Sequence, residues 1–464
     1  MNKKIDLIIK NGRVFYKNKF QIINVMVNKG KILEISDNIK SYEAKKIIDA
    51  KNRTVIPGVV DVHFHVRAPS FPERGTVESE SKAAAKGGIT TLFEMPISDP
   101  CMSNAKVLLD RKKHFSNHTF INYAFIPAIG KLTDNNLNGL IKNGAIAFKI
   151  FTIAAPLNRK SEFNGLCFTD ERKILKALIH AKKSQLVTIF HAEDQGLLNY
   201  FKHKENEFEK SDPAVHNATR PPITEALAIS KILNLNMIAK SKIHIAHVTS
   251  ELSVDLISYF QKKGQDISAE TCPHYLFKTE NDVIKVGPFG KINPPIRSKI
   301  DQNKLWRGLS NNTLTIVASD HASFSYAEKI KGKKNFIKAP PGAPSGELML
   351  PLMLNAVSKK KLKMKKVIEL MCINPAKRFN IFPKKGIIKK GSDADITIID
   401  LNEKWTVDSK KLITEGKNCA NLYYGDKIKG NIKTTIVNGK VVYDKNKFYK
   451  YPDMNYYVTP TNKR

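Results

Sequence analysis

Asp61-Val62-His63-Phe64-His65, directly after Ile56-Pro57-Gly58, is the stretch that decides how this chain of 464 residues is organised. Side chains two positions apart in a β-strand lie on one face, so His63 and His65 point the same way. Two imidazoles on one face of one strand are half of a metal site. In barrels of parallel strands, the strand ends that carry such residues form the active site.

Four more residues of this kind lie at or near the ends of short apolar runs. They are Lys149 in Ala-Phe-Lys-Ile-Phe, His191 in Phe-His-Ala-Glu, His247 in Ile-Ala-His-Val and Asp320 in Ala-Ser-Asp-His. Imidazole nitrogen and carboxylate oxygen suit Zn²⁺ and similar ions. A single histidine is more often structural than a ligand, but this shared position indicates one metal site. His244 is out of phase with His247, and we expect it to point outward into a helix layer.

The middle of the chain alternates strand and helix signals. Helical stretches such as 77–86, which ends at Gly87-Gly88, and 251–263 lie between most of the strands. Eight stretches are predicted as strands: 59–65, 90–95, 120–126, 145–151, 186–191, 243–248, 266–271 and 313–319. Eight strand-then-helix units predict an α/β protein with a (β/α)8 TIM barrel over residues 57–383, which would gather the six residues at one mouth.

Both ends of the chain carry β-hairpin signals. Asn11-Gly12 and Asn438-Gly439 each separate two apolar strands, as in a type I′ turn. Two unrelated β-appendages are one interpretation. Because neither end has enough strands to bury a core alone, we favour one composite β-sandwich domain built from residues 1–56 and 384–464.

Lys149 lies in a run that predicts a buried strand, where an unmodified ammonium is costly. One interpretation is an ion pair at the barrel rim. The other is a carbamate: the neutral amine captures CO₂ and becomes an anion able to bridge two metal ions.

Composition limits the partners and the compartment. The net charge of +34 comes from lysines scattered along the chain without an aromatic-basic module, so we expect solvated charge and no nucleic-acid binding. No apolar run of 18 residues predicts a membrane span, and the first ten residues do not resemble a signal peptide. Five widely spaced cysteines favour a reducing cytoplasm over disulfides or a cysteine-ligated zinc site.

These motifs resemble the cyclic amidohydrolases, which comprise allantoinases, hydantoinases or dihydropyrimidinases, and dihydroorotases. The resemblance covers nearly the whole chain and rests on Pro57-Gly-Val-Val-Asp-Val-His-Phe-His, Ala83-Ala-Ala-Lys-Gly-Gly-Ile-Thr-Thr, Phe148-Lys149, His191-Ala-Glu, His247-Val-Thr-Ser, Glu270-Thr-Cys-Pro-His-Tyr-Leu, Lys291-Ile-Asn-Pro-Pro-Ile-Arg, Ser319-Asp-His-Ala and Gly391-Ser-Asp-Ala-Asp. The resemblance implies that the protein binds two divalent metal ions, and we expect these ions to be zinc. His63, His65 and Asp320 would hold one, His191 and His247 the other, and carbamylated Lys149 would bridge them.

The resemblance implies a hydrolase of carbon–nitrogen bonds in cyclic amides. A hydroxide between the two ions would attack the ring carbonyl, with Asp320 moving the proton to the leaving nitrogen. Relatives are commonly homodimers or homotetramers. A catalytically inactive, dihydropyrimidinase-like assembly protein is the non-enzyme alternative, and it is disfavoured because all six metal positions carry competent residues.

The ring itself is less determined. Arg67 matches the His-x-His-x-Arg pattern of dihydroorotases, where the arginine holds the substrate carboxylate; its alternative is a rim ion pair with Glu73 or Glu78. Asn293 and Gly342, the latter in a Pro/Gly-rich loop, are the other expected substrate-binding residues. We expect an allantoinase-like enzyme first, with a dihydroorotase or a hydantoinase/dihydropyrimidinase as alternatives.

Overall fold

Strand β6 (Val59–His65) lies in a four-stranded parallel sheet in the computed structural model, which describes residues 3–461. The strand order of this sheet is β14-β6-β7-β8, and a second parallel sheet has the order β13-β12-β11-β10-β9. The other strands of the two sheets are β7 (Ile89–Glu94), β8 (Asn122–Phe125), β9 (Ala147–Phe151), β10 (Val187–His191), β11 (Ile243–Ile245), β12 (Ile267–Thr271), β13 (Ile316–Val317) and β14 (His321–Ala322). All eight predicted strand regions therefore contain strands, and the α/β class is confirmed.

The predicted closed barrel is not formed by continuous strand pairing within residues 3–461. Only residues 316–317 of the last predicted strand, 313–319, form a strand, β13, which pairs with β12. Strand β14 pairs with β6 and begins after Asp320, which has a φ of 44°. That backbone conformation cannot continue a strand. On the other side, β8 and β9 form no continuous ladder: an isolated parallel bridge joins Ala128 and Lys149, and the Ile146 amide donates a hydrogen bond to Phe125 O. Two sheets that approach each other at both edges replace the uniform eight-stranded ring.

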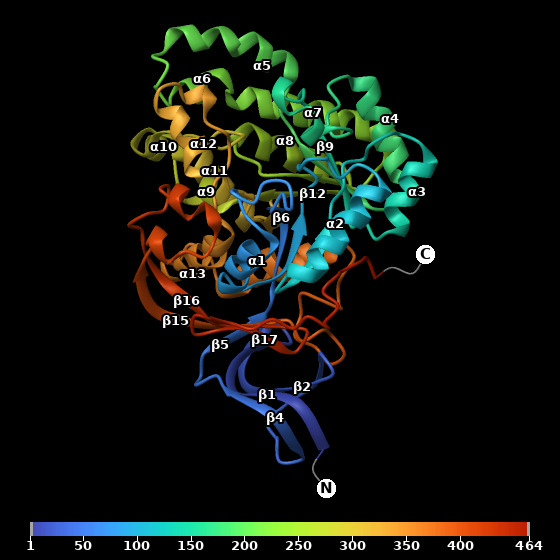
Figure 1. Ribbon diagram of the computed structural model, residues 1–464, viewed down its shortest axis with the longest axis vertical. Helices are drawn as coiled ribbons and strands as arrows, with labels where there is room; N and C mark the ends of the chain where they lie inside the picture. The colour runs from blue at the N-terminus through green and yellow to red at the C-terminus, as the bar shows by residue number, and fades with distance from the viewer. Residues whose placement is uncertain (1–2, 462–464) are drawn as a thin grey trace.

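Helices follow most of the parallel strands and pack against their outer side (Figure 1). They are α1 (Val77–Lys86), α2 (Ala105–His118), α3 (Asp134–Lys142), α4 (Glu171–Lys182), α5 (Gln195–Phe201), α6 (Val215–Thr219), α7 (Pro222–Ala239), α8 (Glu251–Lys262), α9 (Pro273–Phe277), α10 (Glu280–Val286), α11 (Lys299–Ser310), α12 (Tyr326–Lys329), α13 (Met349–Ser358), α14 (Met364–Ile368) and α15 (Asn374–Arg378). Helix α1 illustrates the local rules. Thr76 accepts a hydrogen bond from the Ser79 amide at its start, and Gly88 follows its end with a φ of 82°.

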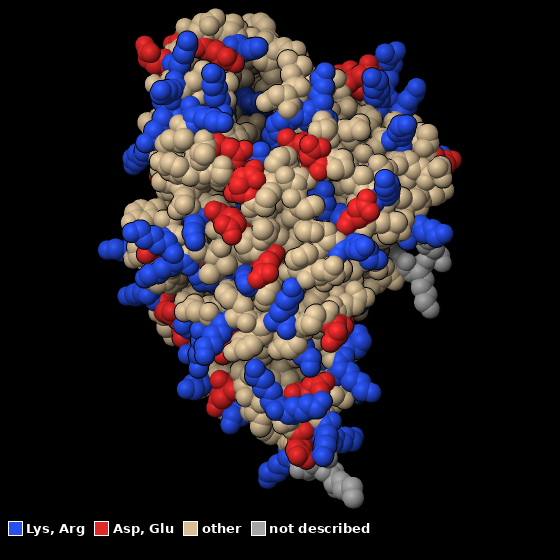
Figure 2. All heavy atoms as spheres, viewed as in Figure 1, with Lys and Arg blue, Asp and Glu red and all other residues tan. Residues whose placement is uncertain are grey.

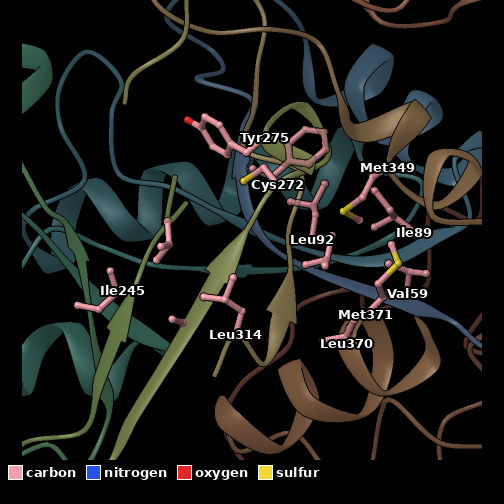
Figure 3. Packing of buried hydrophobic residues seen from close by; sticks show 14 of the residues in the cluster. Val59, Ile89, Leu92, Ile245, Cys272, Tyr275, Leu314, Met349, Leu370 and Met371 are labelled. Carbon is pink, nitrogen blue, oxygen red and sulfur yellow. The ribbon is translucent and has the colours of Figure 1, made fainter. Parts of the chain in front are cut away.

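Two apolar cores hold the strands in place. The larger one lies between strands and helices and includes Val59, Leu92, Cys272 and Met349 (Figure 3). The smaller one contains side chains from strands of both parallel sheets, such as Val60 and Ile189, with Phe379 from the C-terminal half. A core shared by both sheets brings their carboxyl ends to one place.

The two terminal stretches meet in one nine-stranded sheet, in which β15 pairs with β5 (Figure 1). Its strands are β1 (Lys3–Tyr16), β2 (Lys19–Asn28), β3 (Lys31–Ser36), β4 (Tyr42–Asp49), β5 (Thr54–Pro57), β15 (Ile396–Thr406), β16 (Lys427–Val437), β17 (Lys440–Asp444) and β18 (Lys447–Phe448). Buried Lys385 lies nearby, with its Nζ 3.0 Å from Asp393 and 2.6 Å from Asp395. Asp395 also accepts a hydrogen bond from Asn122 of β8, so this cluster ties the sheet to the parallel strands.

Basic side chains are spread over the whole face shown in Figure 2, with acidic side chains between them. On this face, the distribution agrees with solvated lysines better than with one nucleic-acid-binding patch. Within residues 3–461, none of the helices combines the length and the hydropathy required to cross a bilayer.

Candidate metal centre

His63 and His65 come together with Asp320 at the carboxyl ends of the parallel strands. The Nε2 atoms of His63 and His65 lie 3.3 and 3.6 Å from Asp320 Oδ1. All three residues are buried, and one ligand atom from each lies within 4.8 Å of the others. The structure thus forms the three-residue group expected from the strand ends, and the same group could hold a metal ion.

His191 and His247 form a second pair beside the first. His191 ends β10, and its Nδ1 lies 2.9 Å from Nε2 of His247, which follows β11 with a φ of 36°. The rings of His63 and His247 are 5.3 Å apart, so the two groups are contiguous. Four histidines and one aspartate from four separate segments therefore share one site.

Lys149 lies in β9 and is fully buried. Its Nζ has no hydrogen-bond partner within residues 3–461, so the alternative of an ion pair at the rim is wrong for the described structure. Burial lowers the pKa of Lys149 to about 8, against the nearby carboxylates of Glu270 and Asp320, and so increases the fraction of neutral amine near neutral pH. A neutral amine is the form that reacts with CO₂.

The protonation of the histidines suits metal binding. Burial, with a contribution from the Lys149 charge, lowers the pKa of His63 to about 4. Burial also lowers the pKa of His191, and it lowers those of His65 and His247 well below the usual value. Neutral imidazoles keep a free lone pair, which is the form that coordinates a cation.

Glu270 and His244 are functional candidates that the sequence reasoning missed. Glu270 Oε1 lies 2.5 Å from His63 Nδ1, its Oε2 lies 3.0 Å from His244 Nε2, and His244 Nδ1 lies 2.7 Å from Ser268 Oγ. His244 is fully buried beside Phe379, so the prediction that it points outward into the helix layer is wrong. The carboxylate binds His63 Nδ1 and leaves Nε2 facing Asp320. Carboxylates hold metal-ligating histidines in this way.

Glu193 plays a comparable part for His191. Its Oε2 lies 2.8 Å from His191 Nε2 and accepts a hydrogen bond from Arg220. A signal was present in the sequence, because Glu193 follows His191 by two residues.

The histidines and Asp320 open onto a cavity of about 760 Å³. Arg67, Asn293 and Gly342 line it, as the sequence analysis expected. Arg67 donates a hydrogen bond from Nη1 to Ser323 O and lies 4.5 Å from the Phe324 ring centre, whereas its buried Nε has no partner within residues 3–461. The alternative of a rim ion pair is wrong: Glu73 faces Arg74 and Glu78 faces Lys82.

The donor set fits divalent metal ions of the zinc type. It combines neutral imidazoles and one carboxylate, which are ligands that zinc prefers. Lys149 Nζ and the Nδ1 atoms of His65 and His247 are buried and lack protein partners within the described residues. Buried polar atoms without partners are rare in folded proteins, and these three belong to residues of the candidate site.

Comparisons with known proteins agree with this geometry. Residues 54–442 match the model of the amidohydrolase family. The chain is similar to an L-hydantoinase from Paenarthrobacter aurescens, with 31% identity over 98% of each chain. It is 33% identical to a dihydroorotase from Clostridioides difficile, over 94% of this chain and 100% of the relative. A solved L-hydantoinase (dihydropyrimidinase) from Arthrobacter aurescens superimposes with a TM-score of 0.90 and 31% identity, covering 96% of this chain and 98% of that one.

Proposed function

Since this chain belongs to the amidohydrolase family, we propose that it is a hydrolase that opens the carbon–nitrogen bond of a cyclic amide. The observation that carries the proposal is the group of His63, His65 and Asp320 at the wall of a substrate-sized cavity. The hydantoinase and dihydroorotase names of its relatives support the ring as the substrate class.

In this proposal His63, His65 and Asp320 hold one divalent ion, and His191 and His247 hold a second. Lys149, as a carbamate, would supply a further anionic ligand to the ions. Zinc is the ion that the ligand types favour. When bound, the ions would supply a nucleophile at neutral pH and polarise the ring carbonyl group.

The protein's own residues would orient the reaction and move the proton. Asp320 lies at the cavity wall, where its carboxylate can take the proton of the attacking water and give it to the leaving ring nitrogen. Asn293 and Gly342 line the same cavity and would orient the ring. The product is a ring-opened carbamoyl-amino acid or a related acid, and the reverse reaction closes the ring.

Two ring classes compete as the substrate. A neutral cyclic ureide of the allantoinase type, or a hydantoin or dihydropyrimidine, would be oriented mainly by backbone contacts at Asn293 and Gly342. An acidic ring such as dihydroorotate would place its carboxylate on Arg67. The environment of Arg67 favours the acidic ring, because its guanidinium is fixed on Phe324 beside the cavity with Nε unpaired. The allantoinase assignment stays a prediction.

For the architecture, we propose that residues 57–383 form a (β/α)8 barrel. Residues 1–56 and 384–464 would form one small β-sandwich domain. The apolar core shared by both parallel sheets supports the barrel, and the β5–β15 pairing supports the composite domain. A homodimer or homotetramer and a cytoplasmic location stay predictions.

A ring-opening assay tests the proposed function. Zinc-loaded protein is compared on dihydroorotate, allantoin, hydantoin and dihydrouracil at matched concentrations near neutral pH. Turnover of at least one ring is expected, with loss of turnover in Asp320→Asn. Preference for dihydroorotate supports Arg67 as a carboxylate-binding residue, and preference for a neutral ring assigns Arg67 a structural role. No turnover of any ring by fully loaded protein contradicts the proposal.

A further inference from the structure

Two loops form the wall of the cavity that faces the candidate metal centre. Residues 291–293 follow the short 3₁₀ helix η4 (Gly287–Gly290), and residues 337–342 overlap another one, η6 (Phe336–Lys338). We call these two segments the substrate-reading wall, because they contain Asn293 and Gly342. Asn293 lines the cavity, and its Oδ1 is buried without a partner within residues 3–461.

Two buried lysines hold the segments of this wall through backbone carbonyl groups. Lys291 donates from Nζ to the carbonyl oxygens of Phe336 and Ile337, at 3.2 and 2.7 Å. Lys329, at the end of α12, donates from Nζ to the carbonyl oxygens of Pro288 and Lys291, at 3.3 and 3.0 Å. Lys291 therefore links the two segments directly, and Lys329 links the first segment to α12, which precedes the second segment in the chain.

The backbone of the wall is also held by hydrogen bonds to the carbonyl groups of residues 291 and 292. The carbonyl oxygen of Lys291 also accepts a hydrogen bond from the Gly342 amide at 2.9 Å. The next carbonyl, that of Ile292, is 2.9 Å from His216 Nε2. Asn293 and Gly342 are thus placed by contacts that converge on residues 291 and 292.

Packing alone does not explain the two ammonium groups. Lys329 is fully buried and Lys291 is 6% exposed, and all four of their acceptors are backbone carbonyls rather than carboxylates. Burying a cation without a counter-charge is costly, and a methionine would fill a similar volume without that cost. Burial lowers the pKa of each lysine to about 7, with nearby Arg220 adding to the effect on Lys291.

We propose that Lys291 and Lys329 are positioning residues that hold the substrate-reading wall at a set distance from the metal centre. Neither residue would touch the reacting atoms. Loss of either ammonium should let the two loops separate and weaken substrate binding, while the metal ligands stay in place. Only the expected change in kinetics rests on the proposed ring hydrolysis. The effect on the loops is measured separately, by amide hydrogen exchange.

The test uses full-length, zinc-loaded Lys291→Met and Lys329→Met variants. Lys331→Met is the matched control, because Lys331 lies in the neighbouring 3₁₀ helix η5 (Ile330–Lys333), is exposed and does not line the cavity. Amide hydrogen exchange is followed in residues 287–293 and 336–342. Exchange of these segments should rise about tenfold in both test variants, as expected for loss of a charge-assisted hydrogen bond, and stay unchanged in the control.

Kinetics and metal content provide the second readout. On the ring that the wild type prefers, KM should rise about tenfold with kcat within about twofold, and zinc content should not change. Lys291→Arg, which keeps the charge and the donors, should recover part of the loss and serves as the second variant if Lys291→Met does not fold. Unchanged exchange in both segments overturns the proposal, as does parallel loss of zinc and kcat. If the wild type turns over no ring, the proposed function fails and exchange alone decides the role of the lysines.

Discussion

Replacement of Glu270 by glutamine tests whether this buried carboxylate positions His63 for metal binding. Glutamate offers two acceptor oxygens, and here one faces His63 and the other faces His244. Glutamine has nearly the same shape but one acceptor and one NH₂ donor. One of the two imidazoles must therefore lose its acceptor or change its tautomer. If His63 Nδ1 loses its acceptor, Nε2 is no longer held as the metal-binding nitrogen.

The size of the effect follows from the contacts. Burial alone would raise the pKa of Glu270, but its interactions with His63 and His244 outweigh burial and hold the pKa below the usual range. The carboxylate is thus charged and bound on both sides. Removal of such a partner typically lowers metal affinity about 10- to 100-fold, which is roughly 1.4–2.7 kcal/mol.

Competition with a chelator measures the zinc affinity of the wild type and of Glu270→Gln, and circular dichroism confirms that both are folded. Glu347→Gln is the control, because Glu347 is also a buried carboxylate but contacts Lys86 and the Ile413 amide instead of a histidine. Zinc affinity should fall only in Glu270→Gln. A zinc affinity within about twofold of the wild type would refute the positioning role, since a lost partner costs about tenfold or more.

Three further predictions follow from buried charges. Lys149→Ala should lose bound metal and turnover, with partial rescue by a short carboxylic acid; unchanged metal content by elemental analysis contradicts the carbamate. Arg67→Met should raise KM about 10- to 100-fold for an acidic ring and leave a neutral ring unaffected, since a charge-assisted hydrogen bond is lost; equal effects on both rings contradict carboxylate binding. Lys385→Met should lower the free energy of unfolding by about 3–5 kcal/mol in denaturant titrations, because Asp393 and Asp395 lose their buried partner. Burial opposes the charge of Lys385, but the two aspartates raise its pKa, so its contribution is complete at neutral pH and disappears only as the pH rises through that raised pKa.

Local sequence signals predicted most of the elements of this fold. The alternation of apolar runs with helical stretches marked all eight strand regions, and Gly87-Gly88 marked the end of α1. The interruption of the last strand was not predictable in this way. Residues 313–319 are apolar enough for one strand, but Asp320 adopts a left-handed conformation between β13 and β14. That conformation depends on contacts with β6, which lies far away along the chain.

The candidate site was likewise predictable in part from the sequence. The sequence by itself determined which residues can bind metal, because His63 and His65 alternate on one strand and because His191, His247 and Asp320 also lie at strand ends. Only the tertiary structure decided their partners. Glu270 and His244 lie beside His63 in the folded chain. Lys291 contacts carbonyl groups 45 and 46 residues away in the sequence, and Lys329 contacts carbonyl groups 41 and 38 residues away. The physical reason is that ligand chemistry is a property of a side chain, whereas a hydrogen-bond partner is set by which segments pack together.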